Sequence, residues 1–250
     1  MAGTCGDDDR FKDLFAGRNG SVLGDMKAQA DKDASRDTPP PDSKLTQTKE
    51  QWAREGRQPQ TRRRDGGGRM PPGQHLSQDW PVLDLGHRPL VPTDQWEMKV
   101  LGAVERPLTL SWAQFLDLPQ IDLTTDIHCV TSWSTYDNRW QGVAVRTLAE
   151  AAGLKDTAGF AVLHSHDGYT TNLPLDHFLA DTSLIVHSWN GAPLTRDHGG
   201  PARAVVPSLY FWKSAKWLRQ ITFLEKDAPG YWETRGYHNL GDPWKQQRYG

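Results

Sequence analysis

The chain has 250 residues, which is enough for one large domain or two small ones. Its 29 Lys and Arg residues nearly balance 31 Asp and Glu residues, so a formal net charge of −2 provides no basic field for nucleic acid. The only cysteines are Cys5 and Cys129, which argues against a disulfide framework and fits a reduced, cytoplasmic protein. No apolar stretch is long enough to span a membrane, and the first residues lack the apolar core of a secretory signal.

Residues 1–69 are predicted to form a disordered polar arm, and residues 70–250 a folded domain. The arm is rich in charged residues and holds only three aromatic ones. So little apolar area cannot offset the conformational entropy that ordering would cost. Short helices are expected within the arm at residues 9–15 and 48–55.

The first part of the folded domain is predicted to contain two strands and a helix. Apolar and charged side chains alternate over residues 96–100, which indicates a half-buried strand. Residues 108–110 are expected to be short and extended. Ser111 and Gln114 have the spacing of a capping box, so a helix should begin there and end before Pro119.

A strand is predicted from Ile121 to Cys129, because alternate residues along it favour opposite faces of a sheet. Residues 132–138 are turn formers and aromatic residues, and we expect them to form a loop. Cys129 would then stand where a buried strand opens into a loop. Rigid scaffolds commonly present reactive groups at such positions.

The rest of the chain alternates short strands with short helices. Thr147 and Glu150 repeat the capping-box spacing and predict an Ala-rich helix that ends at Gly153. Asn190 and Gly191 predict a type I′ hairpin turn. Because no βαβ rhythm is present, the pattern favours an α+β fold with mixed β-sheets and short helices. Further strands are expected at residues 160–164, 184–189, 204–207 and 219–225.

Cys129 has a structural and a functional interpretation. Buried core cysteines are common, but the turn-rich stretch that follows this one also fits a functional thiol. Such a thiol could be a nucleophile activated by a downstream histidine, or one soft ligand to a transition metal whose other ligands come from a cofactor. A structural zinc site is disfavoured, because no second cysteine lies nearby and His128 belongs to the opposite strand face.

A second group of chemistry-bearing residues lies within residues 198–217. A Gly-Gly pair permits close backbone approach, and Arg203, Lys213 and Lys216 are interleaved with aromatic residues. Cations in this setting suit a phosphate or another anionic group, and the aromatic rings could flank a flat ring system. The alternative is a basic surface cluster whose stems cover apolar surface.

The stretch D-I-H-C-V-T-S-W-S-T-Y-D-N-R-W-Q-G-V, from Asp126 to Val143, resembles the sulfite-oxidase-type molybdopterin family, specifically its short bacterial branch. Five further motifs match in order from about Met70 to the end of the chain. They are P-P-G-Q-H-L, G-Y-T-T-N-L-P-L, H-G-G-P-A-R, L-Y-F-W-K-S-A-K-W and G-Y-H-N-L-G-D-P-W. The resemblance implies the molybdopterin-binding fold of that family and an oxidoreductase that carries a molybdenum–molybdopterin cofactor.

The resemblance also implies roles for single residues. Cys129 would be the protein's thiolate ligand to molybdenum, and hence the catalytic residue, beside the dithiolene of the pterin. The residues that would line the pterin and its phosphate are His75, Ser165, His198, Arg203, Lys213, Ser214 and Lys216.

The chain departs from the family in one informative place. Sulfite oxidases carry an arginine shortly after the cysteine that helps to bind sulfite, whereas the first basic residue after Cys129 here is Arg139. A closer analogy is the stand-alone subunit that reduces methionine sulfoxide in the periplasm, but that protein is exported and no export signal is visible here. The substrate and the electron partner are therefore left open.

Together these observations predict a cytoplasmic, monomeric bacterial enzyme that performs two-electron oxygen-atom transfer. Its substrate would be a small S- or N-oxide or a sulfite-like molecule, with an electron donor or acceptor as partner and no nucleic acid. Two alternatives belong to other classes. One is a hydrolase or transferase that depends on Cys129, and the other is a module that binds phosphate or another anion without catalysis.

Overall fold

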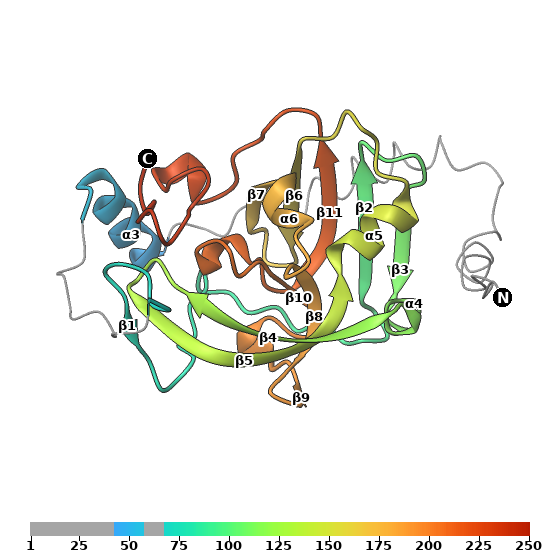
Figure 1. The fold of residues 1–250 in the computed structure, drawn as a ribbon, viewed down its shortest axis with the longest axis horizontal. Coiled ribbons are helices and arrows are strands. Elements are labelled where there is room, and N and C mark those ends of the chain that lie inside the picture. Colours follow the sequence, from blue (N-terminus) through green and yellow to red (C-terminus); the bar gives the residue numbers. More distant parts are fainter. Residues whose placement is uncertain (1–42, 58–67) are drawn as a thin grey trace, which may run out of the picture. The chain divides into compact units, whose positions relative to one another are not determined.

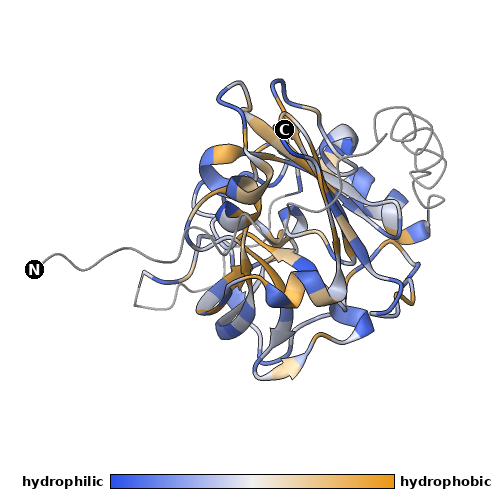
Figure 2. Ribbon diagram, turned by 90° about the vertical axis from the view of Figure 1, so that its right-hand side faces the viewer, coloured by the Kyte–Doolittle hydropathy of each residue, from blue (hydrophilic) through white to orange (hydrophobic). Residues whose placement is uncertain are grey.

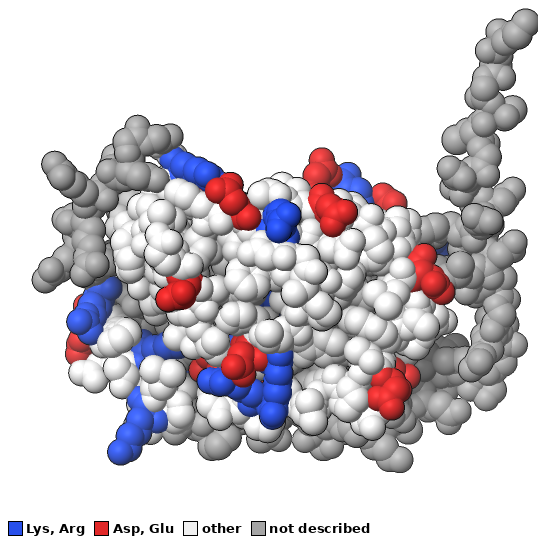
Figure 3. Space-filling view, turned by 90° about the horizontal axis from the view of Figure 1, so that it is seen from below, with Lys and Arg blue, Asp and Glu red and all other residues white. Residues whose placement is uncertain are grey.

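Two β-sheets with short helices around them make up the described part of the chain, residues 43–57 and 68–250 of the computed structural model (Figure 1). Apolar residues concentrate along the central strands, while loops and outer helix faces are mostly hydrophilic (Figure 2). On the face shown in Figure 3, Lys and Arg side chains lie among Asp and Glu instead of forming a basic patch. None of the described helices is long and apolar enough to cross a membrane.

The first sheet carries the strand that leads to Cys129. β4 and β5 form a long antiparallel hairpin, and β5 also pairs with β8. At Gly142 these last two strands come so close that an added Cβ would stand 2.1 Å from the carbonyl oxygen of Ile185, so only glycine fits. The strands of this sheet are β1 (His75–Leu76), β4 (Gln120–His128), β5 (Trp133–Ala144), β8 (Leu184–Trp189), β9 (Ala192–Pro193) and β10 (Arg203–Val205).

The second sheet is mixed and has the strand order β3-β2-β11-β6-β7. β11 lies at its centre, parallel to β2 and antiparallel to β6. Its apolar side chains Ile221 and Phe223 are fully buried, as is Met98 on β2. The strands are β2 (Glu97–Gly102), β3 (Leu108–Ser111), β6 (Phe160–Ser165), β7 (Thr170–Pro174) and β11 (Leu218–Leu224).

The helices are short and lie at the edges and ends of the sheets. In Figure 1 α3 lies beside the C-terminal segment, which is the chain after residue 230, and away from β2 and β3. The α-helices are α3 (Lys44–Arg54), α4 (Trp112–Asp117), α5 (Val145–Ala152) and α6 (Leu175–Phe178), and the 3₁₀ turns are η1 (Arg196–His198), η2 (Phe211–Lys213) and η3 (Glu233–Arg235). This arrangement of mixed sheets and short helices confirms the predicted α+β class.

Several local predictions are confirmed. The capping box is present at the start of α4, where the Ser111 side chain accepts from Gln114 N and the Gln114 side chain accepts from Ser111 N. Asn190 and Gly191 both have positive φ, of 51° and 82°, as a type I′ turn requires. α5 ends at Gly153, which adopts the left-handed conformation.

Three local predictions are wrong. Residues 133–138 are not a loop, because they begin the strand β5, so only Cys129–Ser132 connect it to β4. Thr147 is not an N-cap, because α5 begins two residues earlier. Disorder is also wrong for residues 44–54, which form α3 and bury Ala53. The helix predicted at residues 9–15 and the remainder of the arm lie outside the described residues.

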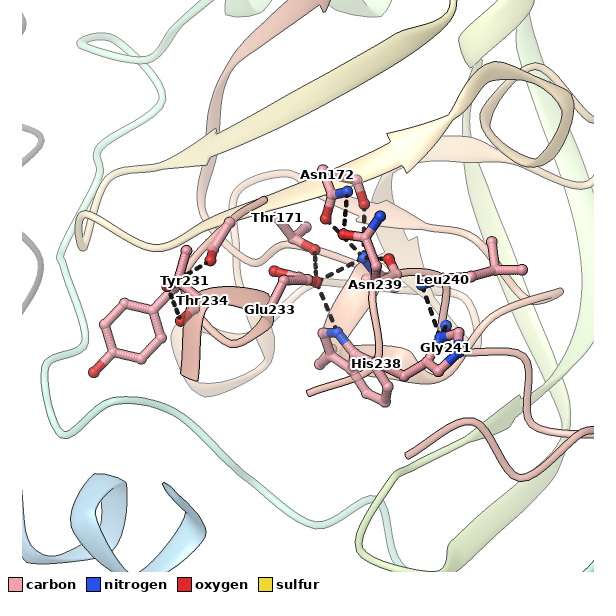
Figure 4. Close-up of polar contacts among 12 residues, drawn as sticks. Thr171, Asn172, Tyr231, Glu233, Thr234, His238, Asn239, Leu240 and Gly241 are labelled. Carbon is pink, nitrogen blue, oxygen red and sulfur yellow. Dashed lines mark hydrogen bonds and ion pairs between the residues drawn. The ribbon is translucent and has the colours of Figure 1, made fainter. Parts of the chain in front are cut away.

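A buried ion pair fixes the C-terminal segment to the second sheet (Figure 4). The ammonium of Lys213 lies 2.6 Å from Glu233 Oε1, and both side chains are almost completely buried. The same ammonium donates to Asn172 O and Oδ1, at 2.9 Å each, and to Asn239 O at 2.6 Å. Glu233 Oε1 also accepts from Trp212 Nε1 at 2.9 Å. The network therefore joins η2, β7 and the chain after residue 230.

Lys213→Met should lower the free energy of unfolding by about 3–5 kcal/mol, because it leaves the Glu233 carboxylate buried without its cation. The double variant Lys213→Met/Glu233→Gln should lose less, since no charge is then left unpaired. Urea unfolding followed by tryptophan fluorescence measures both values. The control Lys155→Met removes an exposed lysine and should stay within about 0.5 kcal/mol of the parent. A double variant less stable than the single one would contradict this account of the pair.

Candidate active site

A deep pocket opens between the two sheets and the C-terminal segment. Its empty space is about 770 Å³, which includes open solvent. Its walls come from α3, residues 80–85, the turn after β4, the ends of β6 and β10, residues 211–217 and the C-terminal segment. Of the residues expected from the sequence, the pocket brings together Cys129, Ser165, Arg203, Ser214 and Lys216.

Cys129 lies at the tip of the β4–β5 hairpin, in a four-residue turn. Its N–H donates to Trp133 O at 2.8 Å and its carbonyl accepts from Ser132 N at 3.0 Å. Ser132 has a φ of 75°, a conformation that non-glycine residues seldom adopt. The thiol is free, and Sγ lies 3.2 Å from the hydroxyl of Thr131. The turn thus holds the sulfur at the pocket wall through its backbone bonds and the contact with Thr131.

Side chains that lie far from this turn in the sequence form hydrogen bonds with its carbonyl oxygens. Gln74 Nε2 donates to Cys129 O at 3.0 Å, and Arg248 Nη1 donates to Val130 O. His75 pairs with Trp133 through the backbone of β1, and its N–H donates to Ser132 O at 2.9 Å. Because β1 and the C-terminal segment form hydrogen bonds with the turn, a shift of the sulfur would break several of these bonds.

Opposing effects act on the Cys129 thiol. Burial raises its pKa, because a thiolate is poorly solvated among apolar side chains. The Thr131 hydroxyl and the positive charges of Lys49 and Arg248 act in the opposite direction. A metal cation bound at the sulfur would add to those positive charges and favour the thiolate outright.

Arg203 is buried among aromatic rings. It is 1% exposed, and its guanidinium lies 4.3 Å from the Phe211 ring centre and 5.3 Å from that of Trp80. Three of its donors are used by carbonyl oxygens, among them Ser214 O at 2.6 Å and His198 O at 3.0 Å. No described carboxylate forms an ion pair with it. Burial lowers the pKa of Arg203 to about 9, which shows how poorly its charge is compensated.

Lys216 provides a second cation in the same part of the pocket. Its ammonium donates to Asp197 O at 2.7 Å, and no described carboxylate lies within ion-pair distance. Burial, followed by the nearby charge of Arg203, lowers the pKa of Lys216 to about 7. Gly199 packs against the stem of Lys216, where an added Cβ would stand 2.8 Å from the lysine Cβ. Gly199 therefore permits the close approach of this lysine, whereas an added Cβ at Gly200 would stand 2.3 Å from the carbonyl oxygen of Leu194.

The serines and His198 have different positions relative to the pocket. Ser165 is 1% exposed, and its hydroxyl has no hydrogen-bond partner in the part of the chain that the structure describes. Ser214 Oγ accepts from Val206 N at 2.9 Å, so it secures the backbone beside Arg203. His198 stacks on Trp80 with ring centres 3.9 Å apart, behind the pocket wall. Burial, with Arg203 and Lys216 nearby, lowers the pKa of His198 to about 4, so its ring is neutral at pH 7.

Besides His198, two further residues expected at the cofactor do not line the pocket. His75 does not line the pocket and acts through its backbone, as described above. Lys213 does not line it either, because its ammonium is taken up by Glu233, Asn172 and Asn239. The sequence could not separate Lys213 from Lys216, since the acidic partner of Lys213 lies twenty residues further along the chain.

The pocket also holds residues that the sequence analysis missed. Asp167 is 8% exposed, and burial raises the pKa of its carboxyl to about 6. Trp80 and Trp133 line the pocket, and the buried indole nitrogen of Trp133 has no hydrogen-bond partner among the described residues. Lys49 reaches the pocket from α3. The family match G-Y-T-T-N-L-P-L begins at Gly168, one residue after Asp167, and nothing local marked that aspartate as a pocket residue.

The donor set fits a molybdenum–pterin group. A free thiol suits a soft metal, and no set of three His, Cys, Asp or Glu residues that could hold a metal alone occurs in the described ranges. Arg203 and Lys216 lack acidic partners and can take up a phosphate. The unpaired Ser165 hydroxyl and the Asp167 carboxyl can bond the polar edge of a pterin, and Trp80 offers a flat face.

Comparisons with known proteins agree with this fit. Residues 85–232 match the family model described as the oxidoreductase molybdopterin binding domain. The chain is 50% identical over 190 residues to the uncharacterized oxidoreductase YuiH of Bacillus subtilis, covering 76% of this chain and 96% of that protein. It is 28% identical over 159 residues to the protein-methionine-sulfoxide reductase catalytic subunit MsrP of Campylobacter jejuni, covering 57% and 53%.

Among solved structures, the sulfane dehydrogenase SoxCD of Paracoccus pantotrophus has a similar fold, with a TM-score of 0.50 and 21% identity. The match covers 56% of this chain and 40% of that chain, and it bears on the fold alone. The chain spans nearly all of YuiH but only about half of MsrP. By the family match and the YuiH relationship, the chain belongs to the molybdopterin-binding oxidoreductases.

Proposed function

We propose that this oxidoreductase performs two-electron oxygen-atom transfer on a small S- or N-oxide or a sulfite-like substrate. Cys129 would be the protein's thiolate ligand to molybdenum. Arg203 and Lys216 would bind the pterin phosphate, with Ser165 and Asp167 contacting the ring system. His75, His198, Lys213 and Ser214 would act only as support for the residues that do the binding.

One observation carries the proposal: a free buried thiol and two buried cations without acidic partners line one pocket. Burying an uncompensated charge is costly, and an anionic ligand removes that cost. A thiol in the same cavity supplies a ligand that suits a soft metal. A single group that is anionic at one end and bears a metal at the other satisfies both requirements.

The chain's own residues would bind, orient and exclude water. The bound cofactor would supply the two-electron redox chemistry coupled to oxygen-atom transfer. The hairpin turn fixes the position of the Cys129 sulfur, and Thr131 bonds to it, which tunes its electron donation. Trp80, Phe211 and Trp232 exclude solvent from the pocket, so charges inside it act more strongly than in water.

One relative favours a sulfur substrate, because the name of MsrP refers to a methionine sulfoxide. The hydrolase alternative lacks support, since the described pocket lining contains no histidine that could act as base. A non-catalytic anion-binding module would not need the free thiol. The cytoplasmic location, the monomeric state and the redox partner stay predictions.

The proposal is tested by elemental analysis and dye-linked assays. Purified protein should contain about one molybdenum atom per chain and should react with at least one S-oxide, N-oxide or sulfite in the presence of an artificial electron carrier. Protein that is expressed with molybdate in the medium and contains the pterin, yet turns over none of these compounds, would refute oxygen-atom transfer.

Cys129→Ser should lower turnover at least about 100-fold while the protein keeps most of its pterin, because a hydroxyl is a poor ligand for a soft metal. Molybdenum content, pterin fluorescence after oxidation and dye-linked turnover are measured on the same sample. Cys5→Ser, which changes the chain's other cysteine, serves as the matched control and should be fully active. Unaltered turnover in the Cys129 variant would exclude the ligand role.

Cofactor retention should weaken as the pH rises above about 7, by up to about tenfold in affinity per pH unit. The pKa of Lys216 is lowered to about 7 in the protein, whereas a bound phosphate favours the charged lysine and raises it. Below that pH the lysine is already charged and the affinity levels off. Above it, binding must take up a proton.

The measurement is the pterin content that remains after gel filtration at a series of pH values between about 6 and 9. Lys216→Arg keeps a charge over this whole range and should flatten the dependence. If the variant retained the same slope as the parent, the titrating group would not be Lys216.

A further inference from the structure

Lys49 brings a buried cation to the pocket from outside the part of the chain that matches the family model. It lies on α3, whereas the matched residues are 85–232. The side chain lines the pocket, and the residue is only 7% exposed. A lysine buried to this degree normally has a partner for its charge.

The ammonium of Lys49 has no such partner within the described ranges. No carboxylate or carbonyl there forms an ion pair or hydrogen bond with it, and its recorded contact is with the Trp232 ring, 5.3 Å from the ring centre. Burial lowers the pKa of Lys49, while the charges of Cys129 and Asp84 act the other way. An anion that enters the pocket would supply the missing partner.

Lys49 lies at the Cys129 end of the pocket. The Lys49 ammonium lies over the Trp232 ring, whereas the Arg203 guanidinium lies over Phe211 and Trp80. The charges of Lys49 and Cys129 act on each other, and Asp84 acts on both Lys49 and Lys216. The cations of the pocket therefore lie against different aromatic walls. The turn after Cys129 contributes no cation, since Arg139 is exposed on β5.

α3 holds Lys49 rigidly. The helix begins at Ser43, whose hydroxyl accepts from Thr46 N at 3.1 Å. Glu50 forms an ion pair of 2.8 Å with Arg235 in the C-terminal segment, and Ala53 packs near Gly236. Figure 1 shows the helix beside that segment. A cation fixed in this way loses little entropy when it binds a ligand.

We propose that Lys49 binds an anionic group of the substrate at the Cys129 end of the pocket, so that the enzyme selects negatively charged substrates. The assignment rests on the proposed oxygen-atom transfer at that end. It narrows the substrate class to molecules that carry an oxyanion or a carboxylate. A competing occupant is the cofactor itself, and the experiment separates the two.

The experiment uses the molybdenum-loaded protein and sulfate as the anionic probe, with binding followed by calorimetry. Lys49→Met keeps the apolar stem and removes the charge, and it should weaken sulfate binding at least about tenfold. Lys49→Arg should retain most of the affinity. Lys44→Met, which removes an exposed lysine from the same helix, is the matched control and should bind as the parent does.

Kinetics give a second readout. For a sulfite-like or carboxylate-bearing substrate, Lys49→Met should raise KM at least about tenfold, and the rise in KM should be much smaller for dimethyl sulfoxide, which carries no net charge. Equal sulfate affinity in the Lys49→Met variant and the parent would overturn the proposal. So would loss of molybdenum or pterin from that variant, because Lys49 would then bind the cofactor.

The same samples separate this proposal from the proposed function. A parent protein without molybdenum, or without turnover of any oxide, refutes the oxygen-atom transfer whatever sulfate does. A parent that is loaded and active, but whose sulfate binding does not depend on Lys49, refutes only the role of this lysine.

Discussion

Buried positive charge without protein counter-charge is the constraint on which the site depends. Arg203, Lys216 and Lys49 line one cavity, and none forms an ion pair with a described carboxylate. Such an arrangement is unfavourable by itself and becomes favourable when an anion fills the cavity. Lys213 makes the contrast clear, because Glu233 already neutralises it. Compensated cations hold this fold together, whereas uncompensated ones are left for ligands.

The fold supports this arrangement by keeping the cavity walls rigid. The Cys129 turn is held by backbone bonds to Trp133 and by side chains from far along the chain, Gln74 and Arg248. The opposite wall is secured by the Lys213–Glu233 network, which ties Trp212 to the C-terminal segment. Both devices are buried and hydrogen-bonded, so the charged groups keep their positions before any ligand binds.

Local signals in the sequence predicted local structure well. The Ser111–Gln114 box and the Asn190–Gly191 turn need only neighbouring residues, and both are confirmed. Residues 133–138 were wrongly predicted to be a loop, because Ser, Asp and Asn are common in turns. Pairing with β4 makes them a strand. The helix predicted at residues 48–55 is present as part of α3, but its packing onto the folded domain was missed, because that packing depends on the C-terminal segment, about 180 residues away. The composition of the arm does not reveal that the C-terminal segment packs against it.

Separation along the chain also explains which site residues the sequence could predict and which it could not. Family motifs pointed to Cys129, Arg203 and Lys216, which do share one pocket, but they could not point to Lys49 or Arg248. These two residues lie on either side of the region that matches the family model, and both place positive charge near the thiol. The part of the chain that would hold the pterin phosphate is thus distinct from the parts that set the charge beside Cys129. On these proposed assignments, a substitution on α3 would alter the substrate preference without disturbing the cations that would retain the cofactor.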